Sequence, residues 1–299
     1  MLGDVRPAPG PTDAPVVETG PLVRLHVELS RMLWRIGPAW AVLAGALSAR
    51  ASLSAPDVLL RLATAVVLAD LAWGILRRVI SDQPSNAAPA TAVPELPYAQ
   101  PAAPLARFLH ALAAGQGRGQ PGDRTAWQGL FAGLVLTAAL SWLLGGLAPV
   151  ISAMALGMIL LGWALARRGS RPALCLAVLD VALPWFLGAA LAWRGQDAGI
   201  LLLWFSLAAS FTVLQWGVHR ARLSSGQRMG GVWLGQVGVL AVLLGLHQPW
   251  ALAVTAVLFA PPSWWLARRE EAAGALALSL PWWWAAMVLA AAVAGRMPV

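Results

Sequence analysis

The sequence predicts an all-helical protein that crosses a membrane several times, and three observations lead to that fold class. Of the 299 residues, 59% are hydrophobic and 11% are charged, and the mean hydropathy is +0.68. This composition leaves too little polar material to cover a soluble globule. Apolar runs recur near the length of about 20 residues that a helix needs to cross a hydrocarbon core of about 30 Å. The short segments between these runs carry arginine, as the loops of membrane proteins do.

Nine apolar runs predict about nine transmembrane helices within residues 37–299. In chain order the runs are 36–49, 58–80, 127–147, 148–166, 173–193, 198–218, 231–246, 249–267 and 278–294. The first run is short and is weakened by Pro38 and Gly45, so its limits are the hardest to place. The connection 81–126 is long and rich in proline and glycine, which predicts a large loop between the second and third helices.

Charge orients these helices. All 21 basic residues are arginine, and with a cytoplasmic N-terminus 17 of them fall in cytoplasmic segments and four on the other side. The four are Arg50, Arg61, Arg194 and Arg296. This asymmetry obeys the positive-inside rule, and it explains the net charge of +8 without any nucleic-acid partner. Arginine without lysine is typical of a GC-rich genome, and we expect the inner (cytoplasmic) membrane of a prokaryote.

Two features flank the predicted helices. Residues 1–21 are rich in proline and glycine and lack the basic start of a signal peptide, so we interpret them as a disordered cytoplasmic tail. Residues 22–36 place leucines at helical spacing between charged residues, which predicts an amphipathic helix in the membrane interface. Many of the 17 tryptophans stand near span ends, where we expect interfacial belts, including Trp250, Trp264 and residues 282–284.

Four polar side chains within or near the ends of the apolar runs need partners. An unpaired carboxylate in a span costs about 2.5–3.5 kcal/mol on insertion scales, so Asp70 and Asp180 should face a cavity or a partner. Gln215 and Gln236 lie near the facing ends of the sixth and seventh runs. These groups form either a polar patch in a ligand chamber or proton path, or interhelical hydrogen bonds that hold helices together. The histidines are too scattered for a metal set, and no HExxH, GxSxG, P-loop or CxxC motif occurs, so no catalytic residue is assigned.

Two polar cytoplasmic connections, 81–126 and 219–230, distinguish this chain from a plain bundle. Nine helices with enlarged loops at these two places are similar to the intramembrane prenyltransferases of the UbiA-like superfamily. In that family the second helix ends in NDxxDxxxD, and the loop after the sixth helix holds DxxxDxxxG. The segment 34–47, WRIGPAWAVLAGAL, also resembles the family's first helix, in which an Arg-Pro pair precedes a span of small residues.

The first motif is matched only in outline. Asp82 and Asn86 take the positions of the second and third aspartates. Arg78 stands for the asparagine, and Val79 stands for the first aspartate. Asp82 is therefore either one remaining metal ligand or simply the ion-pair partner of Arg78, four residues before it on the same helix.

The second motif has lost both of its carboxylates. Gly226 corresponds to the loop glycine, while Val218 and Arg222 occupy the two acidic positions. The family needs these carboxylates to hold Mg²⁺ against a diphosphate of about three negative charges, because Mg²⁺ prefers oxygen ligands. Neither valine nor arginine can take that role, so no metal is expected unless the diphosphate site works in another way.

The resemblance implies a catalytically degenerate relative that binds an isoprenoid or another lipid in a central chamber. An active prenyltransferase is the first alternative, with Arg78, Arg222 and Arg228 holding a prenyl diphosphate directly through their guanidinium groups. A small-solute transporter is the second, and it would need helices interrupted near the midplane, for which Pro184 and the pair Pro261 and Pro262 are the candidates. A structural subunit of a membrane complex is the third.

The arginine asymmetry makes a direct prediction about topology. Reporter proteins fused after Pro89 and after Ser225 should both lie in the cytoplasm, and a reporter at the C-terminus should lie on the opposite side. Alkaline phosphatase and green fluorescent protein fusions would measure this. A C-terminus on the same side as Ser225 would remove the odd number of spans, and the resemblance to UbiA-like proteins with it.

Overall fold

The computed structural model describes residues 37–51, 53–81, 123–170, 172–192, 198–223, 229–268 and 272–296. All of its regular structure in these ranges is helical. The described residues belong to one compact unit, Ile36–Val299. The predicted tail 1–21, the interfacial helix 22–36 and nearly all of the loop 81–126 lie outside the described residues.

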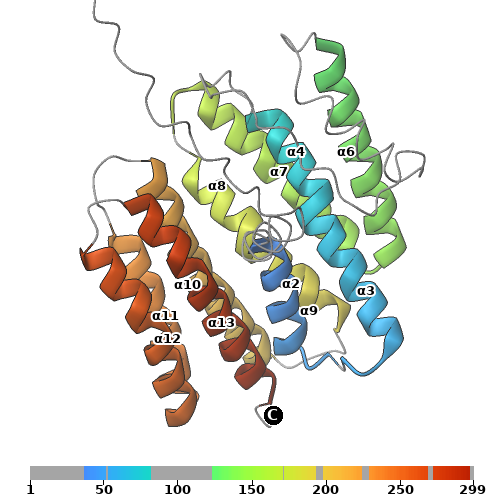
Figure 1. Cartoon of the computed structure of the whole chain (residues 1–299). Coiled ribbons are helices and arrows are strands. Elements are labelled where there is room, and N and C mark those ends of the chain that lie inside the picture. Colours follow the sequence, from blue (N-terminus) through green and yellow to red (C-terminus); the bar gives the residue numbers. More distant parts are fainter. Residues whose placement is uncertain are drawn as a thin grey trace, which may run out of the picture. The chain divides into compact units, whose positions relative to one another are not determined.

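Each predicted apolar run falls on a helix (Figure 1). The helices are α2 (Gly37–Ser48), α3 (Pro56–Val66), η1 (Val67–Ala72), α4 (Trp73–Ser81), α6 (Asp123–Leu144), α7 (Ala148–Arg167), α8 (Ala173–Ala177), η2 (Val178–Ala182), α9 (Leu183–Leu191), α10 (Ala198–Leu223), α11 (Gly230–Gly245), α12 (Pro249–Arg268) and α13 (Ala272–Arg296). The π-helical turns η1 and η2 join their neighbours without a break, so α3 to α4 and α8 to α9 are two continuous helices. Helix α6 begins at Asp123, which is inside the predicted loop.

Five of the described helices are long and apolar enough to cross a membrane. They are Pro56–Arg77, Ala148–Arg167, Ala173–Leu191, Gly199–Ala221 and Leu278–Arg296. Gly37–Ser48, Leu130–Leu144 and Gly230–Gly245 are apolar but shorter. The described part of the chain therefore has the make-up of a helical membrane protein.

Helices α2 and α9 lie in the middle of the bundle (Figure 1) and pack against each other. On one side, α10 to α13 form a hydrophobic core with α2 and α9. On the other side, α3, η1, α4 and α7 form a second core, to which α2 contributes Val42 and α9 contributes Leu187. The two central helices are thus shared by both cores, and they position the polar groups that lie near their ends.

Glycine allows the close approach of α2 and α9. A Cβ atom on Gly45 would lie 1.9 Å from the carbonyl oxygen of Trp185, and one on Gly188 would lie 1.9 Å from the carbonyl oxygen of Val42. Neither position has room for any side chain, because the obstructing atoms belong to the backbone of the other helix. Small residues permit this kind of helix contact in membranes, where packing drives association. The same arrangement joins α10 to α11 at Gly217, Gly231 and Gly235.

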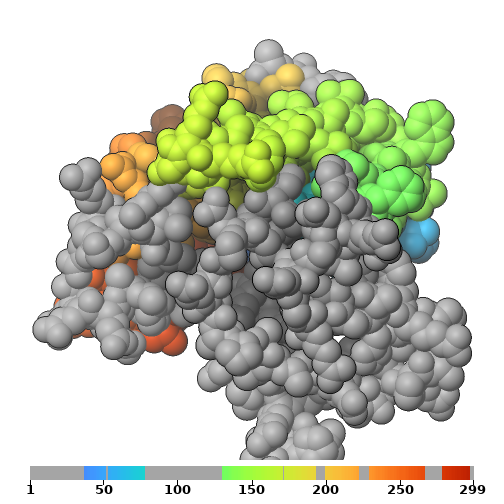
Figure 2. Space-filling model, turned by 90° about the horizontal axis from the view of Figure 1, so that it is seen from above, coloured from blue at the N-terminus to red at the C-terminus, as the bar shows by residue number. Residues whose placement is uncertain are grey.

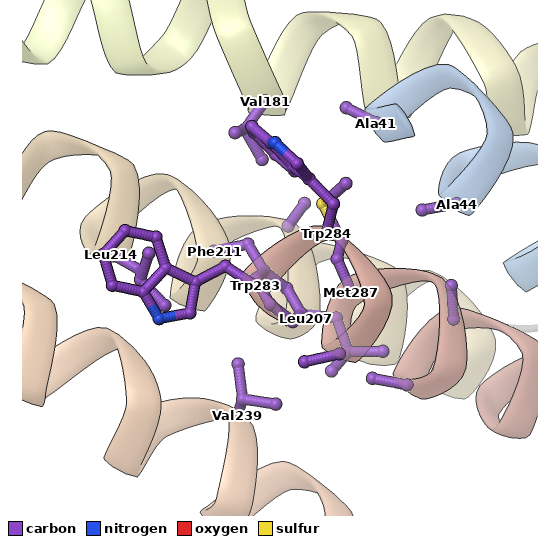
Figure 3. Close-up of a cluster of buried hydrophobic side chains, with 14 of the residues drawn as sticks. Ala41, Ala44, Val181, Leu207, Phe211, Leu214, Val239, Trp283, Trp284 and Met287 are labelled. Atoms are coloured by element: carbon purple, nitrogen blue, oxygen red, sulfur yellow. The ribbon is translucent and has the colours of Figure 1, made fainter. Parts of the chain in front are cut away.

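The tryptophans are divided between the surface and the core. Trp250 and Trp264 are 51% and 56% exposed, as an interfacial belt requires. The belt prediction is wrong for Trp283 and Trp284, which are buried on α13. Figure 3 shows the Trp284 ring beside Val181 and the Trp283 ring extending toward α10 and α11. The Trp284 ring packs against α2 at Gly37, where an added Cβ atom would lie 3.1 Å from the ring.

The prolines do not interrupt the helices in the way that the transporter alternative requires. Helix α12 continues through Pro261 and Pro262, so the predicted break there is wrong. Pro184 is the second residue after η2, at the start of α9. Because proline has no N–H, it cannot donate to the carbonyl of Asp180 four residues earlier, and the π-helical turn lies at that point.

Replacing Gly45 with alanine should destabilise the protein, because the new methyl group would collide with the backbone of α9. Overpacking of this kind costs about 1–3 kcal/mol in free energy of unfolding. Gly157→Ala on α7 is the matched control, since no heavy atom lies within 4 Å of its added Cβ, and it should stabilise the helix by about 0.5–1 kcal/mol. Reversible unfolding in mixed micelles would measure both. Equal effects of the two substitutions would show that the α2–α9 contact is looser than described.

Candidate functional site

Asp180 is the centre of a buried polar cluster formed by three helices. Its carboxylate accepts a hydrogen bond from Nη1 of Arg77 through Oδ1 and contacts Nε2 of His219 through Oδ2 at 2.8 Å. Arg77 lies on α4, Asp180 on η2 and His219 near the end of α10. We call these three residues the Asp180 cluster. It connects the end of the second predicted helix (α3 to α4) to the end of the sixth (α10) by way of the fifth (α8 to α9).

Local backbone structure places the aspartates of both continuous helices on π-helical turns. Asp70 lies in η1, and Asp180 lies in η2. A π-helical turn contains an extra residue, which shifts the following side chains around the helix, and such turns are frequent at functional sites. Asp70 and Arg77 line one small cavity of about 10 Å³, which is room for a single water molecule. The polar region therefore extends from η1 to α10.

Pairing makes the buried carboxylate tolerable. The Asp180 residue is only 7% exposed, and an isolated charge at such a site would cost several kcal/mol. A charge-assisted hydrogen bond from Arg77 and one from His219 offset that cost. The Arg77 side chain is 36% exposed, and Asp180 engages its Nη1 nitrogen. A guanidinium group carries five N–H donors, so Arg77 can hold the carboxylate and still donate to a ligand.

The contact with Asp180 determines the proton on His219. Because a carboxylate only accepts hydrogen bonds, Nε2 of His219 must carry the hydrogen that lies between them. The amide nitrogen of Gln215, one turn earlier on α10, lies 3.5 Å from the same Nε2 atom. Two donors facing each other at that distance contribute little, so Gln215 borders the cluster and does not hold it together.

The predicted site residues are partly brought together. Asp180 and Gln215 meet through His219. Gln236, on α11, instead accepts a hydrogen bond of 3.2 Å from Ser263 on α12, and its amide nitrogen has no partner within the described ranges. This supports the interpretation that Gln236 forms a hydrogen bond between two helices.

The residues taken from the family motifs mostly lie outside the described residues. Asp82, Asn86 and Arg228 fall in the undescribed segments, and only the backbones of Arg78 and Arg222 are described. Arg78 directly follows Arg77 on α4, and Arg222 lies on α10, the helix of His219. In the part of the chain that the structure covers, no three His, Cys, Asp or Glu side chains gather as a metal site would need.

Sequence reasoning missed Arg77 and His219 as site residues. Arg77 is one of the 17 arginines in the predicted cytoplasmic segments, and His219 is the first residue of the predicted connection 219–230. The sequence does contain one signal. Burying the Asp180 carboxylate in a span costs free energy unless a cation or a hydrogen-bond donor lies near it. The pattern did not show which of the arginines and histidines that partner is, because these residues are far apart in the sequence and meet only when three helices pack.

Removing Asp180 should destabilise the protein more than removing an exposed aspartate. Asp180→Ala leaves Arg77 without its carboxylate, and breaking a buried pair costs about 3–5 kcal/mol. Because Arg77 is partly exposed, we expect a loss of about 2–3 kcal/mol in free energy of unfolding. The double variant Arg77→Met/Asp180→Leu should lose less than the two single variants together, since no charge is left unpaired.

Asp57→Ala is the matched control for this measurement. Asp57 is exposed in the first turn of α3, where its interaction with the helix dipole is worth about 0.3–1 kcal/mol. Unfolding in mixed micelles would compare the variants. A loss for Asp180→Ala no larger than that for Asp57→Ala would mean that the Asp180 cluster does not hold the helices together.

No family model, no curated protein and no solved structure matches this chain. The chemistry of the Asp180 cluster and of the helices around it therefore carries the functional interpretation.

Proposed function

We propose that this chain is a nine-span membrane protein of UbiA-type prenyltransferase architecture that binds an isoprenoid or another lipid in a central chamber and has lost metal-dependent catalysis. Its N-terminus lies in the cytoplasm, and its membrane is the inner membrane of a prokaryote. The observation that carries the proposal is the Asp180 cluster, which joins Arg77 at the end of the second helical run to His219 at the end of the sixth.

This juxtaposition is what the proposed architecture needs. In UbiA-like proteins the ends of the second and sixth helices hold the diphosphate, so these ends must face each other. Here the Arg77 and His219 side chains both reach one carboxylate. Arg222 follows His219 by three residues on α10, which is about 5 Å along the helix axis. Arg78 follows Arg77 directly on α4. Both additional arginines therefore start from backbone positions close to the cluster.

The charge of the cluster favours a ligand with phosphate and disfavours a metal. Asp180 is already neutralised by Arg77, so its oxygens are poor candidates for holding Mg²⁺. Arg77 and Asp180 carry opposite charges, and the sequence adds two more arginines, Arg78 and Arg222, within one turn of the cluster residues. Guanidinium groups match phosphate oxygens in pairs, so these arginines suit the diphosphate of a prenyl lipid without a metal ion.

A proton-coupled transporter is the second candidate, and one observation favours it. Asp180 and His219 form a buried carboxylate–histidine pair at 2.8 Å, and pairs of this kind inside membranes serve as proton relays. The continuity of α12 through Pro261 and Pro262 stands against it, because transporters commonly bind their substrates at interrupted helices.

Geranylgeranyl diphosphate should bind to the purified protein in EDTA, because arginine supplies the positive charge that the family takes from Mg²⁺. Binding should weaken with added salt, since the Debye length is about 8 Å at physiological ionic strength. Arg222→Asp should weaken binding at least tenfold. Arg61→Asp, on the exposed surface of α3, is the control and should bind as the parent does. Equilibrium binding in nanodiscs with neutral lipid would measure these affinities.

Two results would contradict the proposal in different ways. Mg²⁺-dependent prenyl transfer to an aromatic acceptor that is lost in Asp82→Ala would show a working metal site and an active enzyme. Equal affinity for geranylgeraniol and its diphosphate, unchanged by Arg222→Asp, would show that the arginines only orient the chain and that any chamber takes a neutral lipid. Proton uptake coupled to solute flux in liposomes would favour the transporter.

A further inference from the structure

A second cavity lies beside the Asp180 cluster, between α7 and α8. Its volume is about 210 Å³. Apart from Arg77 its walls are apolar, and they include Met158, Ile159, Trp163 and Leu179. Cavities of about 150 Å³ with such walls stay dry and take up small apolar molecules, whereas pockets for drug-sized ligands begin at about 300 Å³. This volume therefore suits one hydrocarbon chain and is too small for a whole lipid.

The depth of the cavity matches one leaflet of a membrane. Its wall on α7 runs from Met158 to Ala166, which is eight residues or about 12 Å along the axis. Half of a hydrocarbon core is about 15 Å. Helix α7 also lies at the edge of the bundle (Figure 2), where several of its large side chains, among them Leu160 and Leu161, are exposed. Trp163, which does line the cavity, is 39% exposed, so the cavity reaches the surface of the described bundle.

The two ends of this cavity differ in charge. Among the described residues of its wall Arg77 alone is charged, and it lies at the inner end, bonded to Asp180 next to Leu179. The Arg167 guanidinium lies 4.2 Å from the ring centre of Trp163, another wall residue. Asp180 balances the charge of Arg77, so the remaining positive charge is that of Arg167 at the outer end of the cavity, where α7 ends. A negative lipid headgroup is complementary to this charge.

We infer that the cavity between α7 and α8 binds one hydrocarbon chain of an anionic membrane phospholipid, with the headgroup at Arg167 and the chain running inward toward Leu179. This site is additional to the prenyl diphosphate site proposed above, and Arg77 borders both. A bound lipid here would hold α7 against α8.

Cys175 makes this inference testable, because it is the only cysteine of the chain and lines the cavity. The probe is the rate of alkylation of Cys175 by N-ethylmaleimide in nanodiscs. With phosphatidylglycerol we expect alkylation several-fold slower than with phosphatidylcholine of the same chain length, because the bound chain covers the thiol. Equal rates in the two lipids would overturn the inference, and this comparison needs no variant.

Two variants on α7 separate the cavity from the general membrane surface. Gly162 faces the cavity, and a Cβ there would lie 3.4 Å from that of Cys175. Gly162→Phe should fill the space, so that alkylation is slow in both lipids and one fewer phosphatidylglycerol is retained in native mass spectrometry. Gly157→Phe points into open space on the same helix and should behave as the parent does. Retention of the same number of lipids by both variants would also overturn the inference.

These outcomes are distinct from a failure of the proposed function. The phospholipid experiment uses no prenyl diphosphate, and Gly162 is not part of the Asp180 cluster. Loss of lipid protection at Cys175 with intact binding of geranylgeranyl diphosphate would remove only the phospholipid site. The reverse result would remove only the diphosphate site.

Discussion

The ionised carboxylate of Asp180 is the constraint on which the arrangement of the helix ends depends. A charge buried among apolar helices is tolerable only with a cation and hydrogen-bond donors close to it. Arg77 and His219 supply them from two different helices. The ends of α4 and α10 are therefore held beside η2. Packing sets which helices are neighbours, and the ion pair adds the requirement that these three polar groups meet, because an unpaired buried charge would cost several kcal/mol.

Close backbone packing places the helix that carries Asp180 in the centre of the bundle. Helix α9 continues from η2 and approaches α2 so closely that Gly45 and Gly188 have no space for a side chain. Pro184 lies between the carboxylate and this contact, and the π-helical turn at Asp180 accommodates it. One continuous helix thus joins the polar cluster to the tightest contact in the described bundle. Changes in the α2–α9 contact are expected to reach the cluster through a few turns of helix.

Arg77 connects three features of the structure. It donates to Asp180, it borders the small cavity shared with Asp70, and it forms the polar end of the apolar cavity between α7 and α8. Its long apolar stem and its planar group with five donors suit it to such a position, because one side chain can serve an ion pair and a ligand together. Lysine would carry the same charge without the second set of donors.

Composition and periodicity by themselves determined the helical membrane class and the approximate limits of the helices, because the length of an apolar run and the cost of exposing it to water are local properties. They also indicated that Asp180 needs a partner. The identity of that partner, the burial of Trp283 and Trp284, and the continuity of α12 through its two prolines were decided only by tertiary structure. A pairing between Arg77, Asp180 and His219 depends on which helices become neighbours and on how each is rotated about its axis. Those choices follow from packing at residues such as Gly45 and Gly188, whose role is visible only once the opposing backbone is in place.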